Sequence, residues 1–123
     1  MSLSILVADD SKMSRIKIKK IIASLISNAE FSEANNGEEA LTVCRSKTIK
    51  LLFLDLNMPE IDGYQVLRTM KAENISIPTI VITANYQRGS IAEVEEIGGT
   101  IAFLRKPPTV EMIEQTLKEN NFL

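Results

Sequence analysis

The sequence predicts an α/β fold in which a parallel sheet of five strands is covered on both faces by helices. Five short apolar stretches alternate with five amphipathic stretches along the 123 residues. The apolar stretches are nearly continuous, as is typical of strands that are buried on both faces. Short loops that join alternating strands and helices favour a parallel sheet with right-handed crossovers. We therefore expect one domain, residues 1–123.

Each expected element has a local sequence signal. In the first helix, Ile18, Ile21, Ile22 and Leu25 recur at helical spacing. Thr109 is an expected N-cap of the last helix. The strands are expected at residues 3–8, 29–34, 50–55, 77–84 and 100–104, and the helices at residues 9–26, 38–46, 64–73, 90–97 and 109–120. Phe122 and Leu123 follow the last helix; we expect them to pack back onto the core, and the alternative is that they form part of a partner surface.

Composition excludes several classes of function. The formal net charge of -2 gives no electrostatic reason to expect nucleic acid or a membrane surface as a partner. The chain contains no histidine, which excludes histidine-based catalysis, metal ligation and phosphorylation within it. Its single cysteine, Cys44, excludes an internal disulfide and is interpreted as a buried helical residue. Because there is neither a long apolar run nor a signal-peptide pattern, we expect a soluble cytoplasmic protein.

Polar side chains follow four of the five expected strands. The carboxyl ends of parallel strands meet at one edge of a sheet, where α/β proteins bind their ligands. Adjacent carboxylates repel one another unless a cation joins them, and oxygen ligands of this kind suit Mg²⁺. An ammonium and a hydroxyl beside the metal suit a phosphoryl group, which a carboxylate can accept as an acyl phosphate. The polar residues concerned are Asp9, Asp10, Asp55, Thr83 and Lys106, and Ala84 follows Thr83 at the end of the fourth strand.

Each of these residues also has a simpler interpretation. Asp9 and Asp10 precede a helix and fit an N-terminal cap. Asp55 fits an ordinary loop carboxylate, Thr83 an ordinary strand end and Lys106 a solvated surface residue. Their joint placement after the first, third, fourth and fifth strands favours a shared site.

Four motifs occur in a fixed order over the whole chain: LVADD, LFLDLNMPEIDG, VITA and FLRKP. With them the chain resembles the receiver domains of bacterial two-component response regulators, in particular the single-domain, CheY-like members. The resemblance implies a flavodoxin-like doubly wound sheet with strand order 2-1-3-4-5, an order for which CheY is a standard example. It also implies Mg²⁺ as the cofactor and a cis peptide between Lys106 and Pro107.

The resemblance implies a role for each site residue. Asp55 would be the phosphoacceptor. The metal ligands would be Asp9, Asp10, Asp55 and a backbone carbonyl of Asn57. Thr83, Ala84 and Lys106 would bind the phosphoryl group. Thr83 and Phe103 would form the switch, in which the aromatic side chain moves between outward and inward rotamers. Phe103 also fits a simpler interpretation as a partly exposed strand aromatic. Relatives often have tyrosine at this position.

The implied function is a signalling switch and not an enzyme, apart from self-catalysed phosphotransfer and dephosphorylation. A sensor histidine kinase or a phosphotransfer protein would phosphorylate Asp55. The change would reach an output protein through the surface of the fourth helix, fifth strand and fifth helix, including Ile91, Val94 and Arg105. The chain would be a monomeric chemotaxis-type regulator or phosphorelay intermediate, with no nucleic-acid or membrane partner.

Three alternatives belong to other classes. A phosphatase of the haloacid-dehalogenase type would carry an acid–base aspartate two residues after its nucleophile, where this chain has Asn57. A flavodoxin would need a neutral phosphate cradle in the first strand–helix loop, which here carries Asp9 and Asp10. The third alternative is a degenerate receiver that only mediates contacts, and the complete acidic set together with Thr83 and Lys106 argues against it.

Overall fold

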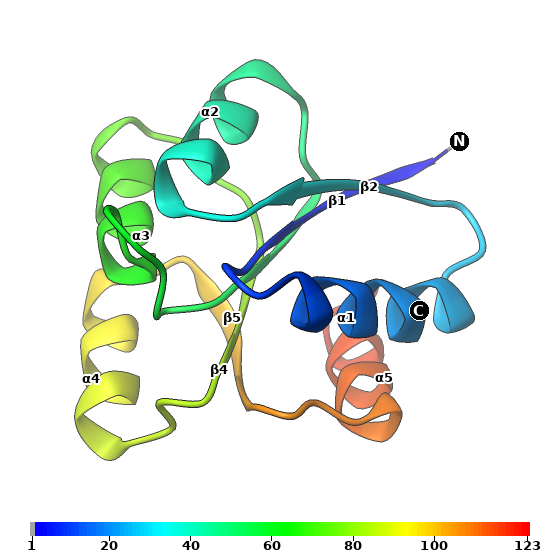
Figure 1. Cartoon of the computed structure of the whole chain (residues 1–123). Coiled ribbons are helices and arrows are strands. Elements are labelled where there is room, and N and C mark those ends of the chain that lie inside the picture. The colour runs from blue at the N-terminus through cyan, green and yellow to red at the C-terminus, as the bar shows by residue number, and fades with distance from the viewer. Residues whose placement is uncertain (1) are drawn as a thin grey trace.

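The computed structural model describes residues 2–123 and contains one parallel sheet between two layers of helices (Figure 1). The sheet has five strands in the order β2-β1-β3-β4-β5, which confirms the expected fold class and strand order. The strands are β1 (Leu3–Ala8), β2 (Ala29–Ala34), β3 (Leu51–Leu54), β4 (Thr79–Thr83) and β5 (Thr100–Arg105). The helices are α1 (Lys12–Leu25), α2 (Gly37–Ser46), α3 (Gly63–Ala72), α4 (Arg88–Ile97) and α5 (Val110–Glu119). None of these helices is long and apolar enough to cross a membrane.

The sheet separates two hydrophobic cores. Successive side chains of a strand point to opposite faces. In β3, Leu51 and Phe53 therefore pack with α1 and α5, and we call this the α1/α5 core. Leu52 and Leu54 pack with α2, α3 and α4 in the α2–α4 core. The central strands are buried on both sides, which explains their continuous apolar sequences.

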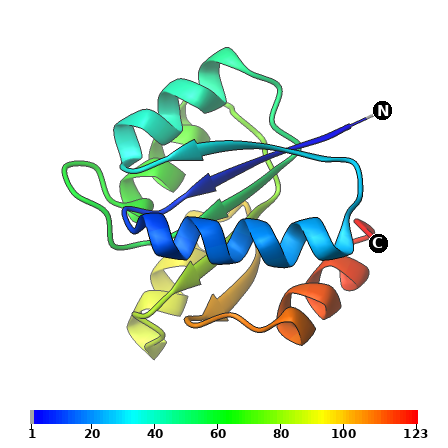
Figure 2. The same cartoon turned by 45° about the vertical axis from the view of Figure 1, so that its right-hand side comes forward.

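The carboxyl ends of all five strands lie at one edge of the sheet (Figure 2). Backbone hydrogen bonds continue one residue beyond the strands at this edge. The Asp9 N–H donates to Ala34 O at 3.0 Å, and the Asp55 N–H donates to Ala8 O at 2.9 Å. The Lys106 N–H donates to the Thr83 carbonyl at 2.9 Å. The sheet itself thus holds the backbones of Asp9, Asp55 and Lys106 in register.

The first helix is capped by Ser11 and not by either aspartate before it. The Ser11 hydroxyl accepts a hydrogen bond from the Ser14 N–H at 3.2 Å. The alternative interpretation of Asp9 and Asp10 as helix caps is therefore wrong. Thr109 caps α5 as expected, with its hydroxyl 3.1 Å from the Met112 N–H.

The loop after β3 passes unusually close to two helix N-termini. A Cβ atom on Gly63 would lie 2.4 Å from the Asp55 carbonyl oxygen and 2.7 Å from the Cα of Leu56. A Cβ atom on Gly37 would lie 2.1 Å from the carbonyl oxygen of Ile61. Real Cβ atoms do not approach so closely, so the path of residues 55–63 depends on both glycines.

The C-terminal residues behave differently from one another. Phe122 is half-buried and packs against the α1/α5 core, as expected. Leu123 is 47% exposed, so the expectation that it also packs onto the core is wrong.

Cys44 lies in α2, packs in the α2–α4 core and is buried. Burial disfavours the thiolate and raises the pKa of Cys44 to about 11. We therefore expect native protein at pH 8 to resist alkylation by iodoacetamide, because the thiolate is the reactive form. Mass spectrometry should show rapid alkylation only after denaturation, and equally rapid alkylation of the folded chain would contradict this.

Candidate functional site

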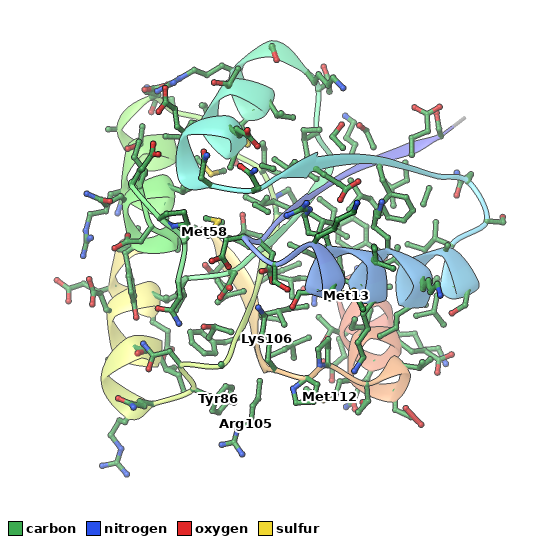
Figure 3. The ribbon with its side chains drawn as sticks, viewed as in Figure 1. Met13, Met58, Tyr86, Arg105, Lys106 and Met112 are labelled. Atoms are coloured by element: carbon green, nitrogen blue, oxygen red, sulfur yellow. The ribbon has the colours of Figure 1, made fainter. Side chains whose placement is uncertain are left out.

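The centre of the site is the Lys106 ammonium, which lies between two carboxylates. Its Nζ is 2.6 Å from Asp9 Oδ2 and donates to Asp55 Oδ2 at 3.0 Å. Both aspartate side chains are almost completely buried, and Lys106 is 18% exposed. These three residues follow β1, β3 and β5, and their side chains meet at the shared edge of the sheet although β4 lies between β3 and β5. Figure 3 shows Lys106 in the middle of this end of the molecule.

Burial and charge act on this cluster in opposite directions. Burial raises the pKa of Asp55, and the negative charge of Asp9 adds to that effect, while Lys106 and the Asn57 N–H oppose it. Burial alone would lower the pKa of Lys106, but its close contacts with the Asp9 and Asp55 carboxylates outweigh burial and raise it. Lys106 is therefore a cation at neutral pH, and the site holds a surplus of negative charge beside it.

Asp9, Asp10 and Asp55 form a group suited to a metal ion. Each offers one carboxylate oxygen, and these oxygens lie within 4.8 Å of one another. Asp9 Oδ2 is buried and accepts no well-directed hydrogen bond, despite its 2.6 Å contact with Lys106. Asp10 is exposed and can reach an ion from the solvent side. An oxygen-only donor set with one open side fits Mg²⁺.

Backbone groups complete the rim of the site. The Asn57 N–H donates to Asp55 Oδ1 at 3.3 Å, and Asp9 Oδ1 accepts from the Ser11 N–H at 2.9 Å. Thr83 is fully buried, and its hydroxyl oxygen accepts from the Asn85 N–H at 3.1 Å. Ala84 is exposed at the end of β4. The peptide between Lys106 and Pro107 is cis, as the family resemblance implied.

Comparison with known proteins identifies the family. The family model described as "Response regulator receiver domain" matches residues 5–118. The chain is a response regulator receiver domain. Among curated proteins, the receiver domain is 33% identical over 116 residues to "Sensor histidine kinase RcsC" of Escherichia coli (strain K12), covering 92% of this chain and 12% of that protein. It is 32% identical over 117 residues to "Sensor protein EvgS" of Escherichia coli O157:H7, covering 95% of this chain and 10% of that protein. The receiver domain thus spans about a tenth of the length of these relatives.

Solved structures show the same fold. A CheY-like receiver domain protein of Methanospirillum hungatei JF-1 matches with a TM-score of 0.86 at 19% identity, covering 98% of this chain and 94% of that one. The chemotaxis protein CheY4 of Vibrio cholerae matches with a TM-score of 0.85 at 22% identity, covering 97% of this chain and 98% of that one.

Two features near the site were not predicted from the receiver domain's sequence. Tyr86 packs edge-on against Phe103 with ring centroids 5.2 Å apart, and the Arg105 guanidinium lies 4.7 Å from the centroid of the Tyr86 ring. Arg15 of α1 donates from Nη1 to the Asp9 carbonyl oxygen at 2.6 Å. An aromatic residue three positions after Thr83 is a usable signal for the first feature. The second depends on how α1 lies across the sheet, and no sequence pattern reports that.

Proposed function

We propose that this receiver domain is a signalling switch in which Asp55 accepts a phosphoryl group in a Mg²⁺-dependent reaction. The observation that carries the proposal is the placement of a buried Asp55 carboxylate against Lys106, within reach of two further carboxylates. The family consists of two-component signalling domains. The arrangement is suited to accepting a phosphoryl group on Asp55, and we propose no turnover of a separate substrate.

The chain's own residues have distinct tasks in this reaction. An Asp55 carboxylate oxygen attacks phosphorus, a new P–O bond forms, and the bond from phosphorus to the donor's leaving group breaks. Lys106 already contacts the Asp55 carboxylate. After phosphorylation, its ammonium would form an ion pair with the phosphoryl oxygens. The N–H groups of Asn57 and Ala84 and the hydroxyl of Thr83 would donate to the same oxygens. Carboxylates of Asp9, Asp10 and Asp55 and the Asn57 carbonyl would hold Mg²⁺, which offsets negative charge as phosphoryl transfers.

The donor we propose is a sensor histidine kinase or a phosphotransfer protein. Its phosphohistidine would break a P–N bond, and the freed imidazole would take up a proton from solvent. Support comes from two relatives, both named as sensor proteins or sensor kinases, that align with nearly the whole of this chain. The receiver would act in the cytoplasm, as a monomer.

The direct test uses acetyl phosphate as a small donor. With Mg²⁺, the protein should gain the mass of one phosphoryl group, and the adduct should be lost at alkaline pH, as acyl phosphates are. Chelation of Mg²⁺ should prevent the gain, since the three carboxylates would then repel the incoming phosphate. Equal labelling with and without Mg²⁺ would contradict the proposed metal site.

The output surface we propose consists of α4, β5 and α5. Phosphoryl oxygens at Asp55 would draw the Thr83 hydroxyl toward them and alter the packing around Phe103. Tyr86 covers Phe103 and is 36% exposed, while Arg105 is exposed beside it, so any movement of Phe103 reaches the surface (Figure 3). Val94 does not belong to this surface, contrary to the sequence-based expectation, because it is 1% exposed in the α2–α4 core.

Beryllofluoride, which mimics a phosphoryl group, tests the output surface. Amide NMR shifts should change around Thr83, Phe103 and Arg105 because the two conformations must differ there. Shifts on α2, around Ala40 and Cys44, should be far smaller and serve as the internal control. Changes confined to the acidic cluster would favour a phosphorelay intermediate over a chemotaxis-type regulator that binds an output protein.

A further inference from the structure

We propose that Arg15 is a positioning residue for the Mg²⁺ site, because it holds the peptide that joins Asp9 to Asp10. This inference rests on the proposed function. Arg15 lies in the first turn of α1, and its side chain is 13% exposed. Its Nη1 donates to the Asp9 carbonyl oxygen at 2.6 Å. The orientation of that carbonyl sets the direction in which the chain continues to Asp10.

Every other polar group of Asp9 has a contact that restrains it. The N–H donates to Ala34 O at 3.0 Å, and Oδ1 accepts from the Ser11 N–H at 2.9 Å. Oδ2 lies 2.6 Å from Lys106 Nζ. The carbonyl oxygen points toward α1, and Arg15 is the side chain that meets it. Without Arg15 the Asp9 carbonyl would lose this side-chain donor, and the peptide that leads to the exposed Asp10 would be less restrained.

Arg15 is itself held in place by β2. Its Nε donates to Glu33 Oε1 at 2.8 Å, and Glu33 Oε2 accepts from Lys19 Nζ at 2.8 Å. Glu33 pairs with Val7 in the register of β1 and β2, so its backbone is fixed relative to the strand that precedes Asp9. The planar guanidinium donates to Glu33 and to the Asp9 carbonyl along two different directions, which a lysine ammonium does not reproduce.

Geometry and charge make opposite predictions for the loss of Arg15, and this allows a clean test. By Coulomb's law alone, removing a cation near three carboxylates tightens Mg²⁺ binding. If Arg15 positions the ligands, its removal weakens binding, as loss of an outer partner of a metal ligand does in other sites by about 10- to 100-fold.

The experiment measures Mg²⁺ affinity by titration calorimetry for the wild-type chain, Arg15→Ala, Arg15→Lys and Lys19→Ala. We expect affinity to fall about tenfold in both Arg15 variants. Lys19→Ala is the matched control, because Lys19 also pairs with Glu33 but has no contact with Asp9 in the described residues. Its Mg²⁺ affinity should stay within twofold of wild type.

A second readout separates positioning from general stability. In ¹³C-labelled protein without metal, the Asp9 carbonyl resonance should shift in Arg15→Lys and not in Lys19→Ala. Unchanged or tighter Mg²⁺ binding by folded Arg15→Ala and Arg15→Lys would overturn the role of Arg15 while leaving the proposed function intact. A wild-type chain that binds no Mg²⁺ would overturn both.

Discussion

Asp55→Asn is expected to abolish phosphoryl labelling by acetyl phosphate and Mg²⁺. Asparagine has nearly the same shape as aspartate, but its neutral amide does not form an acyl phosphate. The neighbouring carboxylates of Asp9 and Asp10 remain in the variant, so the experiment asks which of the three is the acceptor. Intact-protein mass spectrometry should show no phosphoryl adduct under conditions that label the wild-type chain.

The same variant should remain folded. Burial and Asp9 raise the pKa of Asp55, so its protonated form is favoured in the folded chain relative to the unfolded one. The stability that a raised carboxyl pKa adds is complete below the unfolded pKa and is lost as pH rises through the folded pKa. At neutral pH without metal, the thermal midpoint of Asp55→Asn should therefore be no lower than that of wild type.

Asp10→Asn is the control for charge, because it removes one carboxylate and keeps Asp55. Phosphoryl labelling of Asp10→Asn should be slower than that of wild type but still present.

For Asp55→Asn the contradicting outcome is undiminished labelling, which would show that another residue accepts the phosphoryl group.

Gly63→Ala should give the largest loss of stability among the glycine substitutions in α3 and α4. The new Cβ would meet backbone atoms of Asp55 and Leu56, which cannot move away as a flexible side chain can. Overpacking of this kind costs about 3 kcal/mol at its upper range, which corresponds to a thermal midpoint roughly 10 °C lower. Circular dichroism during heating measures the change.

Gly89→Ala is the matched control for Gly63→Ala. No atom lies within 4 Å of a Cβ built on Gly89 in α4. Alanine is the better helix former, so this variant should be stabilised by up to about 1 kcal/mol. Gly63→Ala should also label more slowly, because a shift of the Asp55–Leu56 backbone displaces Asn57, which follows Leu56. A Gly63→Ala protein with wild-type stability and labelling would show that the loop adapts freely.

The placement of Asp9, Asp55 and Lys106 could be predicted because it follows from strand order and strand ends alone. Each residue comes directly after a strand, and the ladder of the parallel sheet extends to its backbone. The apolar runs were equally informative, since a strand such as Leu51–Leu54 buries all its side chains.

Contacts between layers could not be predicted in this way. The Arg15–Glu33 pair depends on the angle at which α1 crosses β2, and the Tyr86–Phe103 contact depends on the path of the β4–α4 loop. The helix-cap interpretation of Asp9 and Asp10 failed because Ser11, the residue after them, is the N-cap and the helix begins at Lys12. Val94 was misplaced because residue type alone does not tell which side of α4 faces α3 and the sheet.

The division of the interior by the sheet has a consequence for how this domain tolerates sequence change. The α1/α5 core and the α2–α4 core have no buried residue in common within residues 2–123. Substitutions far apart, with no shared neighbours, add in free energy to within about 0.5 kcal/mol. Replacements in the helices of one core should therefore add nearly independently to replacements in the helices of the other. During evolution, the helices on one side of the sheet can change in sequence while the residues at the strand ends, and the chemistry they carry, are retained.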